Sequence, residues 1–572
     1  MEKRVLFAIF LSFLVLYLYQ AFVVKPVPKP ANVAASANAT AAPSNAPTTP
    51  ATASPETPST PPPTAAVTSL PENGSAPALV GETHERDVRV ETNEVIATFT
   101  NRGARLKSLR LKRYLDPLTK QPQEVVEQTL PTQPLPFSLQ TPNDETTRTL
   151  NGGLYVVSGE PSGMVNSPID LKFEYRDSSG IKATKAFHFD PSSFVIAMSA
   201  TVDEHDHAIS PAILWGPAVG DAAEVSRYIQ APEGIVYSSD ASKPSRLSPK
   251  DLAKQSTYDG DFKYIGVDDN YFMTIALSPG PSKVSYQTVP LPPAPGTKDV
   301  RTLVSYSIQP TQSRPIKFFV GPKDFDILAA IGPDLTSTIN FGMFAVIVVP
   351  LLRSLKWVHG FIGNWGWSIV LLTVIINAIM FPLRHKSAVS MRKMAEIQPE
   401  VKSIQDRYAK FKATDPQKQN MNKELMELYK QRGVNPAAGC VPMLLTFPVL
   451  FAMWALLQTS IELRGAPWFG WIHDLSSHDP WYVLPVLMGA TSFWQQKMMP
   501  ATGGDPAQQK MMMFMPLFMM FIFLWLPAGA LIYYVVTNIW TIGQQYLTNH
   551  LIGPPPVRNI RPAAERRLKR AN

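Results

Sequence analysis

A series of long apolar blocks constrains this chain more than any other feature. Five blocks lie in the C-terminal part, at about 365–383, 437–459, 481–499, 511–526 and 530–547. Most approach the roughly 20 residues that an α-helix needs to cross a hydrocarbon core of about 30 Å. The last two form one apolar stretch that Pro527, Ala528 and Gly529 interrupt, which predicts a tight hairpin. The fold class expected is therefore a polytopic α-helical membrane protein.

A further apolar run follows Lys3 and Arg4 and extends to Val24. Its length is roughly 20 residues, whereas the apolar region of a signal peptide has about 7–15 and ends close to a small-residue cleavage site. The nearest such pattern, at 35–37, lies well past the end of the run. An uncleaved membrane anchor over 1–24 is favoured, and a cleaved signal is the alternative.

Polar segments must offset these blocks, because the mean hydropathy of the 572 residues is only −0.04. Residues 25–79 are rich in Pro, Ala, Thr and Ser, which predicts a disordered tether. Residues 80–321 contain short segments of alternating polarity, as at Leu171, Phe173 and Tyr175. That period predicts an all-β sandwich domain.

The segment 322–362 is expected to link this β domain to the apolar blocks. Its apolar run at 341–352 is too short to span a bilayer, and Arg353, Lys356 and His359 follow it. A helix lying in the membrane interface is predicted, and a short true span is the alternative.

The distribution of charge predicts the orientation. Residues 384–432 hold 12 Lys and Arg against 6 Asp and Glu, the tail 549–572 holds 6 against 1, and 460–480 holds 1 against 3. By the positive-inside rule the first two segments are cytoplasmic and the third is external. Six spans are expected, formed by 1–24, 363–383 and four more within 434–548, with both termini cytoplasmic and the β domain outside. A crossing at 341–352 would disturb this order, which favours the interfacial helix.

The basic segment 384–433 has apolar residues at alternating spacings of three and four, from Met394 to Phe411 and again from Met421 to Leu428. This pattern predicts a cytoplasmic helical hairpin with a coiled-coil seam, kinked or restarted at Pro399. Its cations and those of the tail suit an RNA-rich surface, such as a ribosome, or anionic lipid. The cations singled out are Lys402, Arg407, Lys410, Lys412, Arg566, Arg567 and Lys569.

Enzyme signatures are missing from the sequence, which has no HExxH, GxSxG, phosphate loop or CxxC. The run His205-Asp206-His207 is interpreted as a solvated turn rather than a metal site. Cys440 is interpreted as a small buried residue rather than a nucleophile. Neither an enzymatic activity nor a cofactor or metal is predicted.

Polar side chains inside the apolar blocks are the candidate functional residues. Thr373 and Asn377 share one helical face, and Tyr534, Asn538, Thr541 and Gln545 repeat at spacings of 4, 3 and 4. They predict a water-accessible groove, and interhelical hydrogen bonds that only hold the bundle together are the alternative. No block carries a central Asp, Glu, Lys or Arg, which argues against a proton-coupled pump.

The C-terminal part contains several short motifs rich in Gly, Trp, Pro and Asn. They are Gly363-Asn364-Trp365-Gly366-Trp367-Ser368, Asn435-Pro436, Gly439-Cys440-Val441-Pro442, Glu462-Leu463-Arg464, Trp471-Ile472-His473-Asp474-Leu475, Asp505-Pro506 and Gln508-Gln509-Lys510. With these motifs the chain resembles the YidC/Oxa/Alb family of membrane-protein insertases. The order of anchor, tether, large β domain, interfacial helix and five-span core is similar to the Gram-negative YidC type.

The resemblance implies a bacterial inner-membrane insertase and chaperone that needs no nucleotide hydrolysis. Such proteins receive nascent membrane proteins from ribosomes, act alone or with the Sec translocon, and can work as monomers. The resemblance also implies a periplasmic β-supersandwich and a hydrophilic groove. The groove-lining threonine and paired tyrosines of the family map onto Thr373, Tyr533 and Tyr534.

One position departs from the family, because Asn377 stands where an arginine is usual in the groove. The nearest cation is Arg384, seven residues on and about 10.5 Å further along a helix. Either Arg384 supplies charge to the groove, or it only anchors the helix at lipid phosphates.

Two other function classes remain as alternatives. A transporter or channel would need repeats or a continuous pore, and the two halves show no repeat. A carbohydrate-active enzyme would need acidic residues converging in a cleft of the β domain. Because the intramembrane polar residues lie outside that domain, the domain is expected to be dispensable for insertion.

Overall fold

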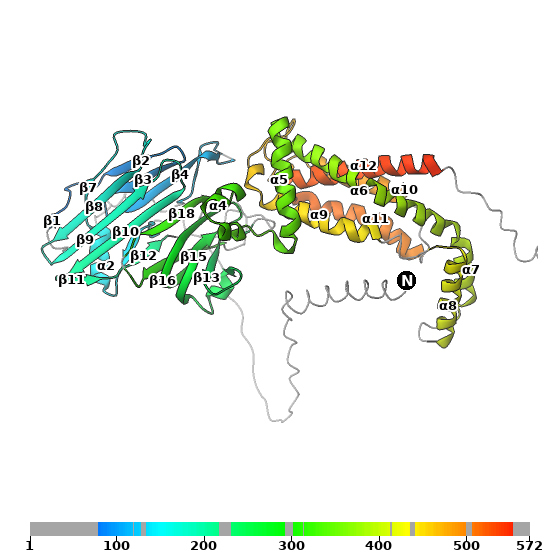
Figure 1. Ribbon diagram of the computed structural model, residues 1–572, viewed down its shortest axis with the longest axis horizontal. Coiled ribbons are helices and arrows are strands. Elements are labelled where there is room, and N and C mark those ends of the chain that lie inside the picture. Colours follow the sequence, from blue (N-terminus) through cyan, green and yellow to red (C-terminus); the bar gives the residue numbers. More distant parts are fainter. Residues whose placement is uncertain are drawn as a thin grey trace, which may run out of the picture. The chain divides into compact units, whose positions relative to one another are not determined.

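A computed structural model describes residues 78–117, 119–126, 133–216, 230–291, 301–312, 314–411, 415–434, 441–498 and 506–552 (Figure 1). The anchor expected at 1–24, residues 25–77 of the expected tether and residues 553–572 of the expected tail lie outside the described residues. The same holds for Lys412, Arg566, Arg567 and Lys569.

Residues 78–322 form the expected β domain, so the all-β prediction is confirmed. Its strands are β1 (Ala78–Val80), β2 (Asp87–Glu91), β3 (Val95–Thr100), β4 (Arg105–Leu115), β5 (Pro122–Glu124), β6 (Ser138–Gln140), β7 (Val156–Ser158), β8 (Ile169–Asp177), β9 (Ile181–Phe189), β10 (Val195–Glu204), β11 (His207–Ile209), β12 (Ala212–Trp215), β13 (Glu233–Ser238), β14 (Ser245–Leu247), β15 (Thr257–Asp268), β16 (Phe272–Leu291), β17 (Arg301–Pro310) and β18 (Ile316–Pro322). Two short helices, α2 (Asp144–Gly152) and α3 (Pro249–Leu252), were not expected from the sequence.

The strands form two sheets, which the ribbon shows as layers (Figure 1). The larger has the order β1-β8-β9-β10-β18-β16-β15-β13-β14, and the smaller has the order β2-β3-β4-β5. Burial alternates along β8 and β9 with the period that the sequence shows. Phe99 of the smaller sheet packs on Phe173 and Phe187 of the larger one, with ring centroids 5.9 and 4.7 Å away. The apolar faces of the two sheets therefore make one core.

His205 and Asp206 form the turn between β10 and β11, as expected. Both have positive φ, 51° and 60°, and the flanking residues Glu204 and His207 are paired. A two-residue turn with positive φ at both positions matches the twist of a hairpin. This motif is thereby explained as a hairpin turn.

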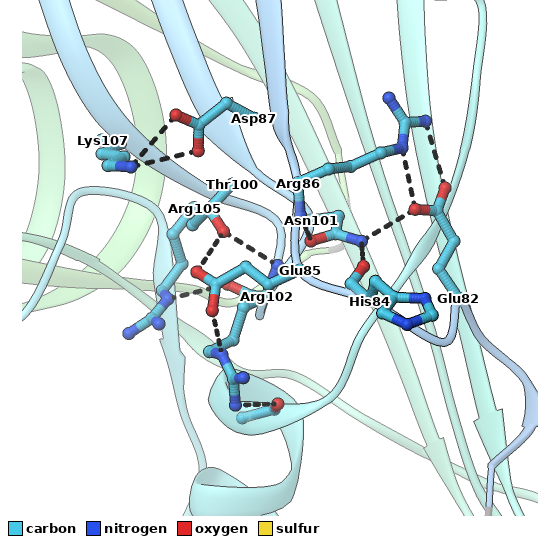
Figure 2. A network of polar contacts seen from close by, with 11 residues as sticks. Glu82, His84, Glu85, Arg86, Asp87, Thr100, Asn101, Arg102, Arg105 and Lys107 are labelled. Atoms are coloured by element: carbon cyan, nitrogen blue, oxygen red, sulfur yellow. Dashed lines mark hydrogen bonds and ion pairs between the residues drawn. The ribbon is translucent and has the colours of Figure 1, made fainter.

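A polar network fixes the chain where it enters the domain (Figure 2). Arg86 pairs with Glu82 and with Glu160, at 2.8 and 2.7 Å. Asn101, after β3, donates to Glu82 and to the carbonyl of His84. The hydrogen bonds to Arg86 and Asn101 lower the pKa of Glu82. These contacts tie the segment before β2 to the turn after β3.

One lysine is completely buried in the domain. The ammonium of Lys185 on β9 donates to the carbonyl oxygens of Gly103, Ala104 and Phe137, at 2.6, 3.3 and 2.7 Å. Gly103 and Ala104 both have positive φ, so their turn presents two carbonyl groups to one donor. Lys185 thus joins the turn before β4, the start of β6 and the larger sheet.

The helical part begins after β18. Its elements are α4 (Phe325–Ile331), η1 (Pro333–Thr338), η2 (Gly342–Phe344), α5 (Ala345–Ile362), α6 (Trp365–Glu396), α7 (Gln398–Arg407), α8 (Pro416–Gln431), α9 (Val441–Thr459), η4 (Ile461–Leu463), α10 (Val483–Met498), α11 (Pro506–Ile522), η5 (Phe523–Trp525) and α12 (Ala528–Ile552). Helices α6, α9, α10, α11 and α12 overlap the five apolar blocks. The chain turns at Pro527 between η5 and α12, as the sequence predicts.

Two described stretches are long and apolar enough to cross a membrane, Gly342–Ile362 and Trp365–Glu396. The first contains α5, which the sequence assigns to the interface on the strength of its short apolar run. The helix is longer than that run because it continues through Arg353, Lys356 and His359. In Figure 1 it runs across the long helices rather than along them. Its buried residues are Val348, Leu352, Leu355 and Val358, and the first three belong to the hydrophobic core.

The junction of α5 and α6 requires particular residues at Gly363, Asn364 and Gly366. Gly363 ends α5 with φ of 70°, a conformation that favours glycine. Asn364 caps α6 by accepting from the backbone N–H of Trp367. A Cβ at Gly366 would lie 2.1 Å from the Trp468 ring, so only glycine fits there.

Helices α7 and α8 form the predicted helical hairpin. Ile397, Val401 and Val434 make a small core that Leu425 and Leu428 cover. Pro399 lies in the first turn of α7, so the arm restarts there. Helix α6 continues through Pro382 to Glu396, so it extends beyond Leu383, where the predicted membrane span ends.

We predict that Lys185→Met destabilises the isolated β domain by about 2–3 kcal/mol, because it leaves buried carbonyl groups without their donor. Denaturant unfolding followed by fluorescence measures this, since Trp215 is the single tryptophan before Trp357. Lys182→Met, which changes an exposed lysine of the same strand, should have little effect. If Lys185→Met were as stable as the wild-type domain or more stable, the three hydrogen bonds of Lys185 would not stabilise the domain.

Candidate functional site

The polar residues of α6 lie in the middle of an apolar helix. Thr373 and Asn377 are buried, with 0% and 2% of their surfaces exposed. The Thr373 hydroxyl donates to the carbonyl of Ile369, and the Asn377 amide donates to the carbonyl of Thr373, at 2.6 and 2.8 Å. These bonds use the hydroxyl hydrogen of Thr373 and one of the two amide hydrogens of Asn377. The side-chain oxygen of Asn377 is left to accept from another element.

Arg384 reaches this oxygen. Its Nη1 donates to Oδ1 of Asn377 at 2.7 Å and to Oγ1 of Thr541 on α12 at 3.4 Å. At 1.5 Å per residue, Asn377 lies about 18 Å and Arg384 about 29 Å from the start of α6. The arginine side chain therefore points back along its own helix, from near one boundary of a 30 Å core (about that thick) toward its middle.

Helix α12 lies beside α6 (Figure 1), and it carries the other polar residues of the candidate site. Besides Thr541, its Thr548 contacts α6, where Oγ1 lies 3.2 Å from Nδ1 of His385. Tyr533 is almost fully buried, and its ring lies 5.8 Å from that of Tyr534. Tyr534 also packs on Phe523 of η5, with ring centroids 5.6 Å apart.

The polar residues predicted to share one face of α12 contact two different helices. Asn538 donates to Ser492 and Thr491 of α10, at 2.7 and 3.1 Å. It therefore makes the interhelical clamp that the sequence left as an alternative. Thr541 faces α6 instead, and Gln545 is half-buried. The 3.6-residue period locates polar positions on a helix but does not say which neighbour each one meets.

The sequence reasoning also missed polar residues of α12, among them Trp540 and Gln544. Within the part of the chain that the structure describes, Trp540 Nε1 and Gln544 Oε1 are buried without a hydrogen-bond partner. Gln544 lies three residues after Thr541 and four before Thr548, on the side that contacts α6. That spacing is the signal that could have identified it. Buried polar atoms of this kind need water or a transient partner.

Exposed apolar side chains cover the outer side of α11 and η5, a surface that suits lipid. They are Met513, Phe514, Met515, Leu517, Phe518, Phe521, Ile522 and Trp525. On the helical hairpin, Lys402, Arg407 and Lys410 are exposed, and Arg407 pairs with Glu424 at 2.8 Å. The candidate site is thus a polar seam between α6 and α12 in an otherwise apolar bundle.

Comparisons with known proteins agree over both parts of the chain. Residues 87–354 match the family described as YidC periplasmic domain, and residues 357–554 match that described as 60Kd inner membrane protein. The membrane protein insertase YidC of Pelobacter propionicus is 33% identical over 96% of this chain and 100% of that protein. That of Syntrophus aciditrophicus is 32% identical over 96% and 99%, and that of Burkholderia cenocepacia 35% over 71% and 72%.

These matches include the β domain, the helices that form the polar seam and the hairpin between them. The chain therefore belongs to the YidC family of membrane protein insertases.

Proposed function

We propose that this chain inserts hydrophobic segments of nascent membrane proteins into the bacterial inner membrane, and helps them fold, through the seam between α6 and α12. The observation that carries the proposal is the contact of Arg384 with Asn377 and Thr541. Moving a charged residue to the middle of a bilayer costs at least about 2.5–3.5 kcal/mol. A polar seam at that depth lowers this cost for a short polar segment of the substrate.

The proposed arrangement has six spans, both termini in the cytoplasm and α5 in the outer interface. The lipid-facing surface of α11 and η5 then lets a substrate helix leave sideways. The basic hairpin receives chains from ribosomes or holds anionic lipid, and the Sec translocon is a second partner. A single copy is sufficient for these steps, and no cofactor takes part.

Reconstitution tests the function directly. Liposomes that contain only the purified full-length chain should insert a small one-span protein, measured as protease protection of its translocated segment. Insertion equal to that of empty liposomes would contradict the proposal. Flux of a small solute without insertion would favour a transporter or channel instead.

Arg384 should select substrates by charge. We predict that Arg384→Gln slows insertion of a substrate with an acidic translocated segment about tenfold, and that of a matched neutral substrate much less, since charge-assisted hydrogen bonds contribute about 1.5–3 kcal/mol. Lys386→Gln, which removes a neighbouring exposed cation, is the control. Equal slowing of both substrates would mean that Arg384 is only an anchor.

We predict that insertion depends on a polar side chain at Asn377. Asn377→Leu removes the acceptor for Arg384 and should reduce insertion of all substrates several-fold, whereas Asn377→Ser keeps a polar group and should be tolerated. Asn538→Leu is the matched control, because that amide faces α10 and should affect thermal stability more than insertion. Full activity of Asn377→Leu would rule out a role for polarity in the seam.

The hairpin should supply the cytoplasmic contact. Replacing both Lys402 and Lys410 by Glu should reduce co-sedimentation with ribosomes, and added salt should weaken the wild-type association because it screens exposed charges. Reversing Lys182 and Lys317, two exposed lysines of the periplasmic domain, controls for net charge. Unchanged co-sedimentation at both low and high salt would exclude these residues as the contact.

A further inference from the structure

The loop that follows α9 makes contacts on two sides. Arg464 donates to the carbonyl of Leu115 at 3.0 Å and to Oε1 of Gln123 at 2.6 Å, at the ends of β4 and β5. Its guanidinium also lies over the rings of Phe272 and Tyr271, 5.0 and 5.8 Å from their centroids. An arginine held by two acceptors and two rings is fixed in both position and orientation.

The same side of the periplasmic domain contacts the end of α9 itself. Nδ2 of Asn270 donates to the carbonyl of Gln458 at 3.0 Å. Gln458 lies in the last turn of α9, where carbonyl groups have no partner within the helix. A side chain of the β domain therefore supplies a cap that the helix lacks.

On its other side, this loop is tied to α5. Glu462 has 10% of its side chain exposed and pairs with Lys356 at 2.7 Å. Lys356 also contacts Asp326 of α4 at 2.6 Å and Asp324 at 3.5 Å. Burial raises the pKa of the Glu462 carboxyl, and the charge of Lys356 opposes this effect. Removing either partner would leave a poorly solvated charge, which is costly.

Internal hydrogen bonds and ion pairs hold the part of the periplasmic domain that contacts α9. Asp269 accepts from the backbone N–H groups of Tyr271 and Phe272, at 2.8 and 2.7 Å. The fully buried Asp268 is held by Arg246 and Lys323, at 2.9 and 2.8 Å. The rings of Tyr271 and Phe272 and the side chain of Asn270 thus belong to a turn that is held by hydrogen bonds within the domain itself.

We infer that the periplasmic domain is a brace for the outer end of α9, with Arg464 as the principal latch. Helix α9 packs against α5, α6 and α12, so the brace fixes a neighbour of the proposed seam. The sequence predicts a dispensable domain, since the polar residues of the membrane helices lie outside it. We infer instead, from the contacts of Arg464 and Asn270, that the attached domain contributes to insertion. The inference rests on the proposed function only for its insertion readout.

Hydrogen exchange tests the brace without any substrate. In the full-length protein, Arg464→Met should make the backbone amides of residues 458–466 exchange about fivefold faster or more, because losing even a modest contact changes the open population by that factor. Arg314→Met, at another exposed arginine of the domain, should leave them unchanged. Unchanged exchange in Arg464→Met would overturn the inference.

A pair of cysteines that can be cross-linked tests the consequence of the brace for insertion within one protein. In a Cys440→Ser background, Gln123→Cys with Arg464→Cys removes the latch, and a short bis-maleimide restores a link between the same two positions. Insertion of a one-span protein should be about fivefold slower before linking and return to within about twofold of the Cys440→Ser parent afterwards. Each single cysteine variant, treated with the reagent, controls for modification.

Two results would overturn the brace: insertion at the parental rate before linking, or inhibition by the link, which would mean that the domain has to move. If the parent itself fails to insert the substrate, the proposed function fails. The exchange measurement still decides on the brace in that case, so the two failures are distinguishable.

Discussion

A polar side chain in hydrocarbon has to find a hydrogen-bond partner, and this requirement organises the helical part of the chain. Asn377 uses its own helix for its donor and Arg384 for its acceptor. The guanidinium in turn reaches Thr541, so one set of contacts joins two helices at mid-depth. Because Arg384 starts near the boundary of the apolar part of α6, its long side chain can carry the charged guanidinium inward to these acceptors.

The same contact resolves the question raised by an asparagine where the family usually has an arginine. The chain does not lack a cation beside Asn377, since the guanidinium of Arg384 lies within hydrogen-bonding distance of it. A cation on a long side chain differs from one fixed at Asn377 itself, because it can move along the helix. In the mechanism that we propose, it withdraws toward the cytoplasm, and a substrate segment replaces Asn377 and Thr541 as the acceptor for Arg384.

Much of the architecture could be predicted from sequence, because composition and period report on burial. Alternating polarity along the chain predicted the β domain. The prolines at 527 and 399 predicted where helices are interrupted. The seven-residue spacing placed Arg384 on nearly the same face as Asn377, but it did not show that the guanidinium also reaches Thr541 of α12. Periodicity placed Asn538 and Thr541 on one stripe, whereas side-chain direction sends them to α10 and α6.

Contacts between distant residues were beyond the sequence reasoning. Arg464 stands within a motif that suggested family membership, and its partner Gln123 lies 341 residues earlier. No spacing rule connects two such positions, and only the fold brings them together. The motif around Gly363, Asn364 and Gly366 is a similar case, because its residues serve a helix junction and the close approach of Trp468.

The proposed function requires that water reaches the seam between α6 and α12 from the cytoplasmic side. Cysteine labelling tests it most directly, because a thiol reacts with maleimide as the thiolate, which forms in contact with water. In a Cys440→Ser background, Thr541→Cys should react from the cytoplasmic side with a membrane-impermeant maleimide. Ile539→Cys, at an exposed apolar position of the same helix, should react far more slowly. Equal and slow labelling of both positions would contradict a hydrated seam.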